Sequence, residues 1–145
     1  MVKIVKMTEK DISGVYNVET NSFNKPWSLN SFRDELNNEI ATYFIAIKEN
    51  EVAGYIGMWA ISGQCDITNI AVLPKYRRQG IGRKLINHLT AHCKSHALSP
   101  IFLEVRESNE AAKSLYSLMG FKIVGNRKKY YADTGEDAII MSLEI

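Results

Sequence analysis

Apolar residues recur along this chain with two different periods, so helical segments and strands can be distinguished before any other feature is considered. Short segments rich in β-branched, aliphatic and aromatic residues are typical of strands. We therefore expect strands at residues 2–7, 43–48, 52–61, 66–72, 101–105, 122–128 and 138–143. Apolar residues at helical spacing predict helices at 8–23, from 29 through 36, at 79–95 and at 109–119.

Capping residues and helix breakers fix the ends of the predicted helices. Thr8 and Ser28 stand where an N-cap is needed, and Pro26 separates the first two helices because it removes a backbone donor. Asn109 can cap the last helix, which Gly120 ends. The second and third predicted strands are joined by a short polar connection, which favours a hairpin. Strands and helices in this order predict an α/β (α+β) fold around one mixed sheet.

The length and composition are those of one ordinary globular domain. The chain has 145 residues, 46% of them apolar and 23% charged, and at this length we expect a single domain over residues 1–145. No apolar run reaches the roughly 18 residues of a membrane span, and the first residues lack the apolar core of a signal peptide. We therefore expect a cytoplasmic protein that binds no membrane, and a monomer.

Charge gives little indication of a macromolecular partner. The net charge of +2 is too small to indicate binding to nucleic acid, and none is expected. Arg127, Lys128 and Lys129 form a local basic patch, which suits a solvated hairpin face better than contact with an acidic partner.

The cysteines and histidines form no recognisable catalytic arrangement. Cys65 lies in a predicted strand and Cys93 in a predicted helix, so we expect both to be reduced packing residues. His88, His92 and His96 recur at four-residue spacing on one helix, which suits a set of metal ligands. They fall on the side of the helix that is predicted to be polar, and we expect no metal there.

A glycine-rich turn directly follows one predicted strand and opens the next helix, with Gly80 and Gly82 at its centre. Glycine lets the backbone approach an anion closely, and the free amides and dipole of a first helical turn favour negative charge. Arg77, Arg78 and Arg83 add positive charge. The spacing matches neither a P-loop nor the three-glycine Rossmann fingerprint. The turn indicates a pyrophosphate site, and the alternative is a tight turn before an ordinary helix.

This turn resembles the acyl-CoA pyrophosphate loop of the GCN5-related N-acetyltransferase superfamily, whose pattern is Arg or Gln, two residues, Gly, one residue, and Gly or Ala. Other segments resemble the branch of the superfamily that acetylates protein N-termini, and with the turn they cover nearly the whole chain. They are Pro26-Trp27-Ser28, Leu103-Glu104-Val105-Arg106, Ser108-Asn109, Ala112, Leu115-Tyr116, Gly120-Phe121, Tyr130-Tyr131 and Glu136–Met141. The resemblance implies a mixed, mostly antiparallel sheet of six to seven strands with about four helices.

The resemblance also implies acetyl-CoA as the co-substrate. Its pyrophosphate would bind the backbone of the glycine turn, which consists of Arg78, Gln79, Gly80, Ile81, Gly82 and Arg83. The pantetheine arm would pair with the backbone of Ile70, Ala71 and Val72, where one amide can polarise the thioester carbonyl. Asn109 would contact the cofactor with its side-chain amide while it caps its helix.

Two side chains are candidates for the acid–base chemistry. Glu104 interrupts an apolar strand where an unpaired charge is costly, and the resemblance implies that it accepts the proton of an attacking amine, directly or through water. From the residues alone, a strand-end glutamate that faces solvent or pairs with Arg106 is the simpler interpretation. The resemblance implies that Tyr116 protonates the departing CoA thiolate or hydrogen-bonds to it, although an aromatic residue on such a helix is more often a core residue. No acyl-enzyme nucleophile stands out, so we expect direct attack of the amine.

The sequence indicates the acceptor amine less clearly than it indicates the co-substrate. An α-amino group with a pKa of about 8 loses its proton more easily than lysine at about 10.4, by about 3.3 kcal/mol. The closing segments resemble enzymes that acetylate the N-terminal alanine of the small-subunit ribosomal protein bS18, which implies a ribosomal-protein N-terminus as substrate and partner. Those enzymes commonly carry Asn before the paired tyrosines, where this chain has Lys129.

Three other functions stay open at this point. The first is a broader activity on protein N-termini or lysines, and the second is the acetylation of a small-molecule amine. The third is an acetyl-CoA-binding regulatory module without turnover, which the presence of both Glu104 and Tyr116 argues against.

Overall fold

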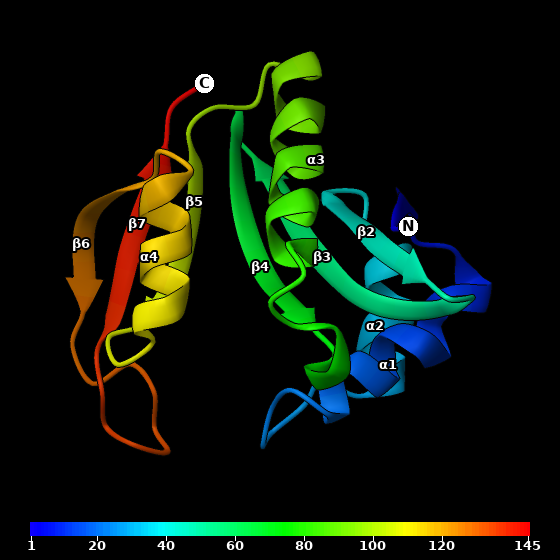
Figure 1. Ribbon diagram of the computed structural model, residues 1–145. Helices are drawn as coiled ribbons and strands as arrows, with labels where there is room; N and C mark the ends of the chain where they lie inside the picture. Colours follow the sequence, from blue (N-terminus) through cyan, green and yellow to red (C-terminus); the bar gives the residue numbers. More distant parts are fainter.

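The computed structural model describes all 145 residues and contains a seven-stranded sheet in the order β1-β2-β3-β4-β5-β7-β6 (Figure 1). The strands are β1 (Lys3–Lys6), β2 (Ala41–Lys48), β3 (Glu51–Ile61), β4 (Gln64–Val72), β5 (Ile101–Arg106), β6 (Lys122–Arg127) and β7 (Ala138–Leu143). All neighbouring strands run antiparallel except β4 and β5, which are parallel. The predicted mixed, mostly antiparallel sheet is confirmed.

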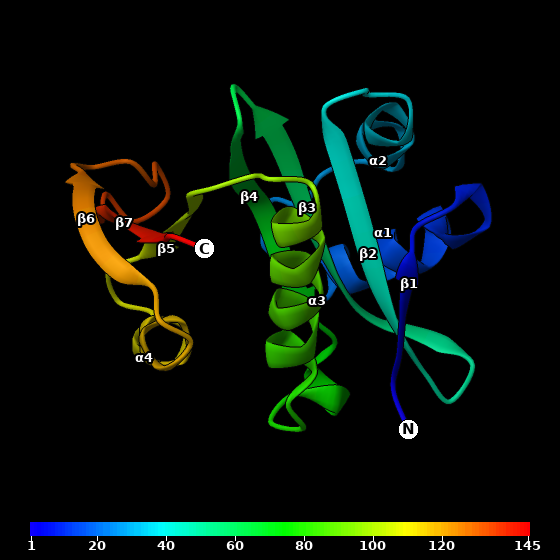
Figure 2. The same cartoon turned by 90° about the horizontal axis from the view of Figure 1, so that it is seen from above.

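Helices cover both faces of the sheet. They are α1 (Ile12–Thr20), α2 (Leu29–Leu36), α3 (Ile81–Ser95) and α4 (Glu110–Leu118), with short 3-10 turns η1 (Glu9–Asp11) and η2 (Pro74–Tyr76). Figure 2 shows α3 and α4 on one face and α1 and α2 on the other. None of these helices combines the length and the apolar character that crossing a membrane requires.

The predicted caps are confirmed at two helices and displaced at a third. Ser28 Oγ accepts a hydrogen bond from the Ser31 amide at 3.1 Å and so begins α2. Asn109 Oδ1 caps α4 in the same way. Thr8 instead begins the 3-10 turn η1, through a 2.9 Å hydrogen bond from its amide to Asp11 Oδ2.

Two predicted helices are longer than those observed. The first was expected to reach residue 23 and ends at Thr20, because the chain turns there toward the loop before α2. The third begins at Ile81 rather than Gln79, because Gly80 has a φ of +79°, a left-handed conformation outside the helical region.

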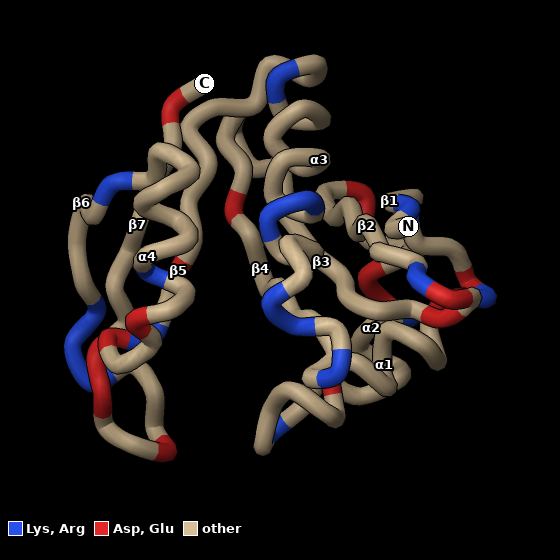
Figure 3. The backbone as a smooth tube through the Cα atoms, in the orientation of Figure 1, with Lys and Arg blue, Asp and Glu red and all other residues tan.

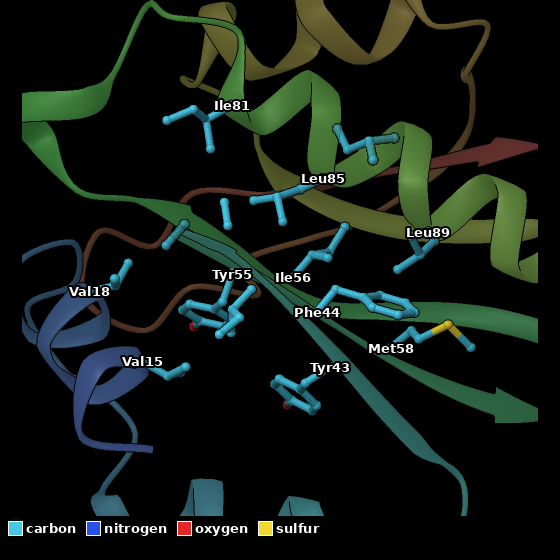
Figure 4. Close-up of a cluster of buried hydrophobic side chains, with 14 of the residues drawn as sticks. Val15, Val18, Tyr43, Phe44, Tyr55, Ile56, Met58, Ile81, Leu85 and Leu89 are labelled. Carbon is cyan, nitrogen blue, oxygen red and sulfur yellow. The ribbon is translucent and has the colours of Figure 1, made fainter. Parts of the chain in front are cut away.

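The core consists of two layers of side chains on either side of the central strands. Leu85 and Leu89 of α3 are fully buried against one face of the sheet, and Val15 and Val18 of α1 against the other (Figure 4). Burial of a side chain of this size stabilises the fold by about 1.5–3 kcal/mol. This packing fixes the start of α3, and therefore the glycine turn, against the end of β4.

β4 and β5 separate soon after they begin. They pair only at Cys65–Ile101 and at Asp66–Phe102, and Figure 1 shows the two strands diverging beyond this point. The rest of β4 therefore has a free edge that faces the gap between the strands.

A β-bulge accompanies this separation. The register between β3 and β4 shifts after Gly57, which leaves Thr68 of β4 without a partner residue. A Cβ atom at Gly57 would lie 2.4 Å from the Tyr43 ring and 2.8 Å from Thr68 Oγ1, so only glycine fits here. The bulge thus depends on a single residue of β3.

Candidate active site

The glycine turn forms a chain of free backbone donors at the start of α3. None of the amides from Arg78 to Arg83 donates a hydrogen bond to another group of the protein. Arg78 and Gly80 both adopt the left-handed conformation, with φ values of 63° and 79°. Successive free amides at a helix N-terminus form an anion-binding site. The structure therefore provides the donors that the sequence predicted.

The surroundings of the turn are open and positively charged. A Cβ at Gly80 would meet nothing within 4 Å, and one at Gly82 would meet only Leu115 Cδ2 at 3.9 Å. Figure 3 shows Lys and Arg along this turn and the first part of α3. Arg77 is partly engaged, because its Nε donates to the Val72 carbonyl at 2.9 Å. Arg78 and Arg83 form no ion pair with a side chain of the protein.

The free edge of β4 exposes backbone groups to the gap beside β5. The Leu73 amide donates to the Ala53 carbonyl of the neighbouring chain segment at 2.8 Å. Hydrogen-bonded positions alternate along an antiparallel ladder, so the next residue of β4 whose amide and carbonyl bond to β3 is Ala71. The amides of Ile70 and Val72 therefore point toward the gap, whereas the amide of Ala71 points toward β3.

Glu104 lies on the opposite face of β5 from the core residues Leu103 and Val105. Its side chain is 33% exposed, and its Oε2 lies 2.7 Å from Arg127 Nε in an ion pair. The pairing with Arg106 that the sequence left open is not observed. Glu104 instead forms an ion pair with the last residue of β6, in a largely apolar surrounding.

Tyr116 lies on α4, which covers the face of the sheet opposite α1 and α2 (Figure 2). It is 7% exposed, and its ring lies 5.9 Å from the ring of Phe121. Burial raises the pKa of Tyr116 to about 12. The phenol oxygen has no hydrogen-bond partner in the protein, and since no fully buried polar side-chain atom lacks a partner, this oxygen keeps contact with solvent. It is therefore free to donate a hydrogen bond to a ligand. Asn109 begins the same helix, with its side-chain oxygen occupied by the Ala112 amide.

A cavity of about 510 Å³ opens beside Glu104, on the face of the sheet that carries α1 and α2. Trp27, Trp59 and Tyr130 form aromatic walls, and Asp66 adds a second carboxylate. Burial raises the pKa of Asp66. Asp66 and Trp59 could not be recognised from the sequence, because their contribution depends on the neighbours of each strand.

A second cavity of about 610 Å³ lies between the loop from α1 to α2 and the loop from β6 to β7. Trp27 and Tyr130 line both cavities, so the two adjoin at these side chains. Tyr130 thus borders both cavities, and Tyr131 lines the second one.

Arg106 fixes the loop that carries the paired tyrosines. Its guanidinium contacts both carboxylate oxygens of Asp133 at 3.0 and 3.1 Å, and lies 4.0 Å from the centre of the Tyr131 ring. Glu136 accepts hydrogen bonds from the hydroxyl and amide of Ser108 at 2.7 and 3.1 Å, and these lower the pKa of Glu136 to about 2. The loop is therefore tied to the segment that joins β5 to α4.

Two buried carboxylates fix the aromatic walls of the cavities. Glu19 accepts hydrogen bonds from the Tyr55 hydroxyl and, at 2.9 Å, from the Trp27 amide. Glu35 accepts hydrogen bonds from the Tyr43 hydroxyl and from Trp59 Nε1, both at 2.8 Å. Buried carboxylates with several donors hold their partners in one geometry. Neither carboxylate is recognisable from the sequence, because its partners lie on other elements.

The cysteines and histidines lie away from these cavities. Cys65 and Cys93 are buried and form no disulfide, and their sulfur atoms lie 3.7 and 3.9 Å from Met58 Sδ. The prediction that they are packing residues is confirmed. The rings of His88 and His92 pack edge-on against Phe44.

Known proteins resemble this chain over its whole length. Residues 12–121 match the model of the Acetyltransferase (GNAT) family. The chain is 42% identical to a Bacillus subtilis protein named "putative ribosomal protein bS18-alanine N-acetyltransferase", over 96% of this chain and 93% of the relative. The crystal structure of the ribosomal-protein-S18-alanine N-acetyltransferase from Escherichia coli matches with a TM-score of 0.93 and 34% identity, over 100% of this chain and 94% of that chain. A Bacillus anthracis chain solved in complex with acetyl coenzyme A shares the fold, with a TM-score of 0.84 at 22% identity, over 100% and 99% of the two chains.

Proposed function

This chain belongs to the acetyltransferase (GNAT) family, and on that premise we propose that it transfers the acetyl group of acetyl-CoA to the N-terminal alanine of ribosomal protein bS18. The relatives named for this activity match nearly the whole chain. The observation that carries the proposal is the gap between β4 and β5, because the free amides of Ile70 and Val72 face it and the cavity that contains the Glu104 carboxylate opens beside it.

The free amides of the glycine turn fit the cofactor. The amides from Arg78 to Arg83 would bind the pyrophosphate, and Arg78 and Arg83 would add charge-assisted contacts. The outward amides of Ile70 and Val72 would pair with the pantetheine arm, and one of them would polarise the thioester carbonyl. Ala71 supports this edge through its pairing with β3.

The acceptor would approach from the opposite face. Its amine would enter the cavity beside Glu104, and the residues that follow would lie in the adjoining cavity between the two loops. Glu104 accepts the proton of the amine as its nitrogen attacks the thioester carbon, and Tyr116 donates a hydrogen bond to the sulfur that leaves as thiolate. We propose that the two groups act on one carbon atom from opposite faces of the sheet, across the gap between the strands.

Mass spectrometry of peptides provides the test. The enzyme is incubated with acetyl-CoA and a synthetic peptide that carries the N-terminal sequence of bS18, and a mass increase of one acetyl group at the α-amine is expected. A matched peptide with a blocked N-terminus and an internal lysine is the control. Acetylation of the lysine with none at the α-amine would contradict the proposal.

The same assay distinguishes between this acceptor and others. A panel of peptides with different N-terminal residues measures the breadth of the activity, and polyamines and aminoglycosides measure small-molecule acetylation. A regulatory module would bind acetyl-CoA and release no CoA with any acceptor. The presence of both a carboxylate at Glu104 and a phenol at Tyr116 favours the catalytic function.

A further inference from the structure

Arg127 pairs with the carboxylate of Glu104, which must be free of other partners in the proposed reaction. Its Nε lies 2.7 Å from Glu104 Oε2 in an ion pair, and the Glu104 carboxylate has no other partner in the protein. Arg127 is the last residue of β6, and its guanidinium lies 5.8 Å from the centre of the Tyr130 ring. Arg127, Glu104 and Tyr130 all line the same cavity.

The contact resembles the one that a substrate would make. A cationic nitrogen 2.7 Å from a carboxylate oxygen is at the distance of an ammonium–carboxylate contact. The guanidinium of Arg127 therefore stands where the α-ammonium of an acceptor would lie. While it stays there, Glu104 cannot accept a proton from that acceptor on the same oxygen.

The pair is exposed enough to be broken. The side chains of Arg127 and Glu104 are 58% and 33% exposed, and an ion pair of this kind contributes at most about 1 kcal/mol. Arg127 lies on the edge strand of the sheet, so its side chain can turn into solvent without disturbing the core. Asp66, in the same cavity, offers an incoming ammonium a second carboxylate.

We propose that Arg127 is a specificity-determining placeholder, which pairs with Glu104 until the α-ammonium of the acceptor displaces it. This inference rests on the proposed function, because it takes Glu104 as the group that receives the amine. The exchange replaces one cation by another, so the carboxylate is never left unpaired in the cavity. An acceptor without a positive charge cannot make this exchange, and the free amine is thereby distinguished from the acetylated product.

Peptide binding measured by calorimetry tests the exchange without turnover. The ligands are an alanine-terminated peptide and its N-acetylated form, titrated into enzyme saturated with CoA. The variants are Arg127→Gln and Lys128→Gln, which remove the same charge at adjacent positions, although only Arg127 contacts Glu104. The Lys128 variant therefore controls for long-range repulsion.

We expect Arg127→Gln to bind the free-amine peptide roughly two- to fivefold more tightly than Lys128→Gln, since the acceptor no longer has to break an ion pair. The two variants should bind the acetylated peptide equally. In a Glu104→Gln background the difference should disappear, because no carboxylate remains to be released. Arg127→Lys, which keeps the charge and the pair, should resemble the wild type.

Two outcomes would overturn the placeholder. One is weaker binding of the free amine to Arg127→Gln than to Lys128→Gln, which would mean that Arg127 contacts the peptide. The other is an equal change for the free and acetylated peptides, which would mean that Arg127 only supports the loop beside it. If the wild type binds neither peptide, the proposed function itself fails; if the wild type binds the free amine and the variants do not differ, only the placeholder fails.

Discussion

Replacement of Tyr116 by Phe separates the catalytic role of this residue from its packing. The substitution removes one oxygen from a ring that is 7% exposed and packs beside Phe121. Since that oxygen has no partner in the protein, no internal hydrogen bond is lost. We expect the free energy of unfolding to change by less than about 0.5 kcal/mol, so any large loss of rate must come from the chemistry.

The structure also limits the size of the rate effect. Burial raises the pKa of Tyr116 to about 12, whereas a thiol has a pKa of about 8.5. Complete transfer of the phenol proton to the thiolate is therefore uphill, by about 4.8 kcal/mol. Donation of a hydrogen bond to the departing sulfur avoids the cost of complete proton transfer, and hydrogen bonds to charged groups contribute about 1.5–3 kcal/mol. The expected loss in kcat is roughly ten- to 150-fold.

Release of CoA from acetyl-CoA, with a saturating alanine-terminated peptide, measures this loss. Thermal unfolding and acetyl-CoA binding should match the wild type, and Tyr16→Phe on α1 is a control for loss of a phenol far from the gap. A folded Tyr116→Phe enzyme with wild-type kcat would refute the reasoning, and would leave Glu104 and the β4 amides to carry the reaction. A loss far above 150-fold would show that Tyr116 transfers its proton.

Three further substitutions and one change of pH extend the test. Glu104→Gln should reduce kcat at least about a hundredfold with little change in acetyl-CoA affinity, as measured by steady-state kinetics and calorimetry. Gly82→Val should weaken acetyl-CoA binding in a folded protein, because its side chain projects where the cofactor would lie, beside Leu115. Arg106→Gln should raise the peptide KM about tenfold or more and change kcat less, because it frees the β6–β7 loop. Hydrogen bonds lower the pKa of Glu136 to about 2. The stabilisation that ionised Glu136 gives to this loop is therefore complete at a pH above the ordinary pKa of a glutamate. It should be lost as the pH falls toward 2, as followed by hydrogen exchange of the loop.

Each of these four predictions has an outcome that would contradict it. Wild-type turnover of Glu104→Gln at every pH would remove the glutamate from the reaction, and unchanged acetyl-CoA affinity in Gly82→Val would remove the turn from the cofactor site. For Gly80, the left-handed φ of 79° would strain any other residue, so position 82 gives the cleaner test. An unchanged peptide KM in Arg106→Gln, or a loop whose exchange is insensitive to acid, would mean that the loop is held by other contacts.

The sequence predicted the elements that depend on neighbours along the chain. The strands and helices follow from local periodicity, and the glycine turn is complete within the seven residues from Arg77 to Arg83. The errors at helix ends are also local, since the left-handed Gly80 decides where α3 begins. The candidate cofactor site could therefore be located without a structure, apart from the finding that Ile70 and Val72 rather than Ala71 face the gap.

The acceptor side could not be predicted in this way because its contacts join distant parts of the chain. Glu19 hydrogen-bonds a tyrosine 36 positions away, and the partner of Glu104 comes from β6. Arg106 shows the difficulty most clearly. It lies two residues from Glu104 on one face of a strand, where extended backbone keeps the side chains apart, and the carboxylate of Asp133 reaches it from the β6–β7 loop instead.

One geometric feature connects the two sides. The gap between β4 and β5 exposes the backbone of Ile70 and Val72 to one face and opens the cavity beside Glu104 on the other. The bulge that accompanies it requires a glycine at position 57, where any Cβ would collide with the ring of Tyr43. Since Tyr43 also holds Glu35, which in turn orients Trp59 in the cavity wall, the same contacts that shape the open edge also shape the acceptor cavity. The open edge of β4 and the wall of the Glu104 cavity therefore share contacts through Tyr43 of β2.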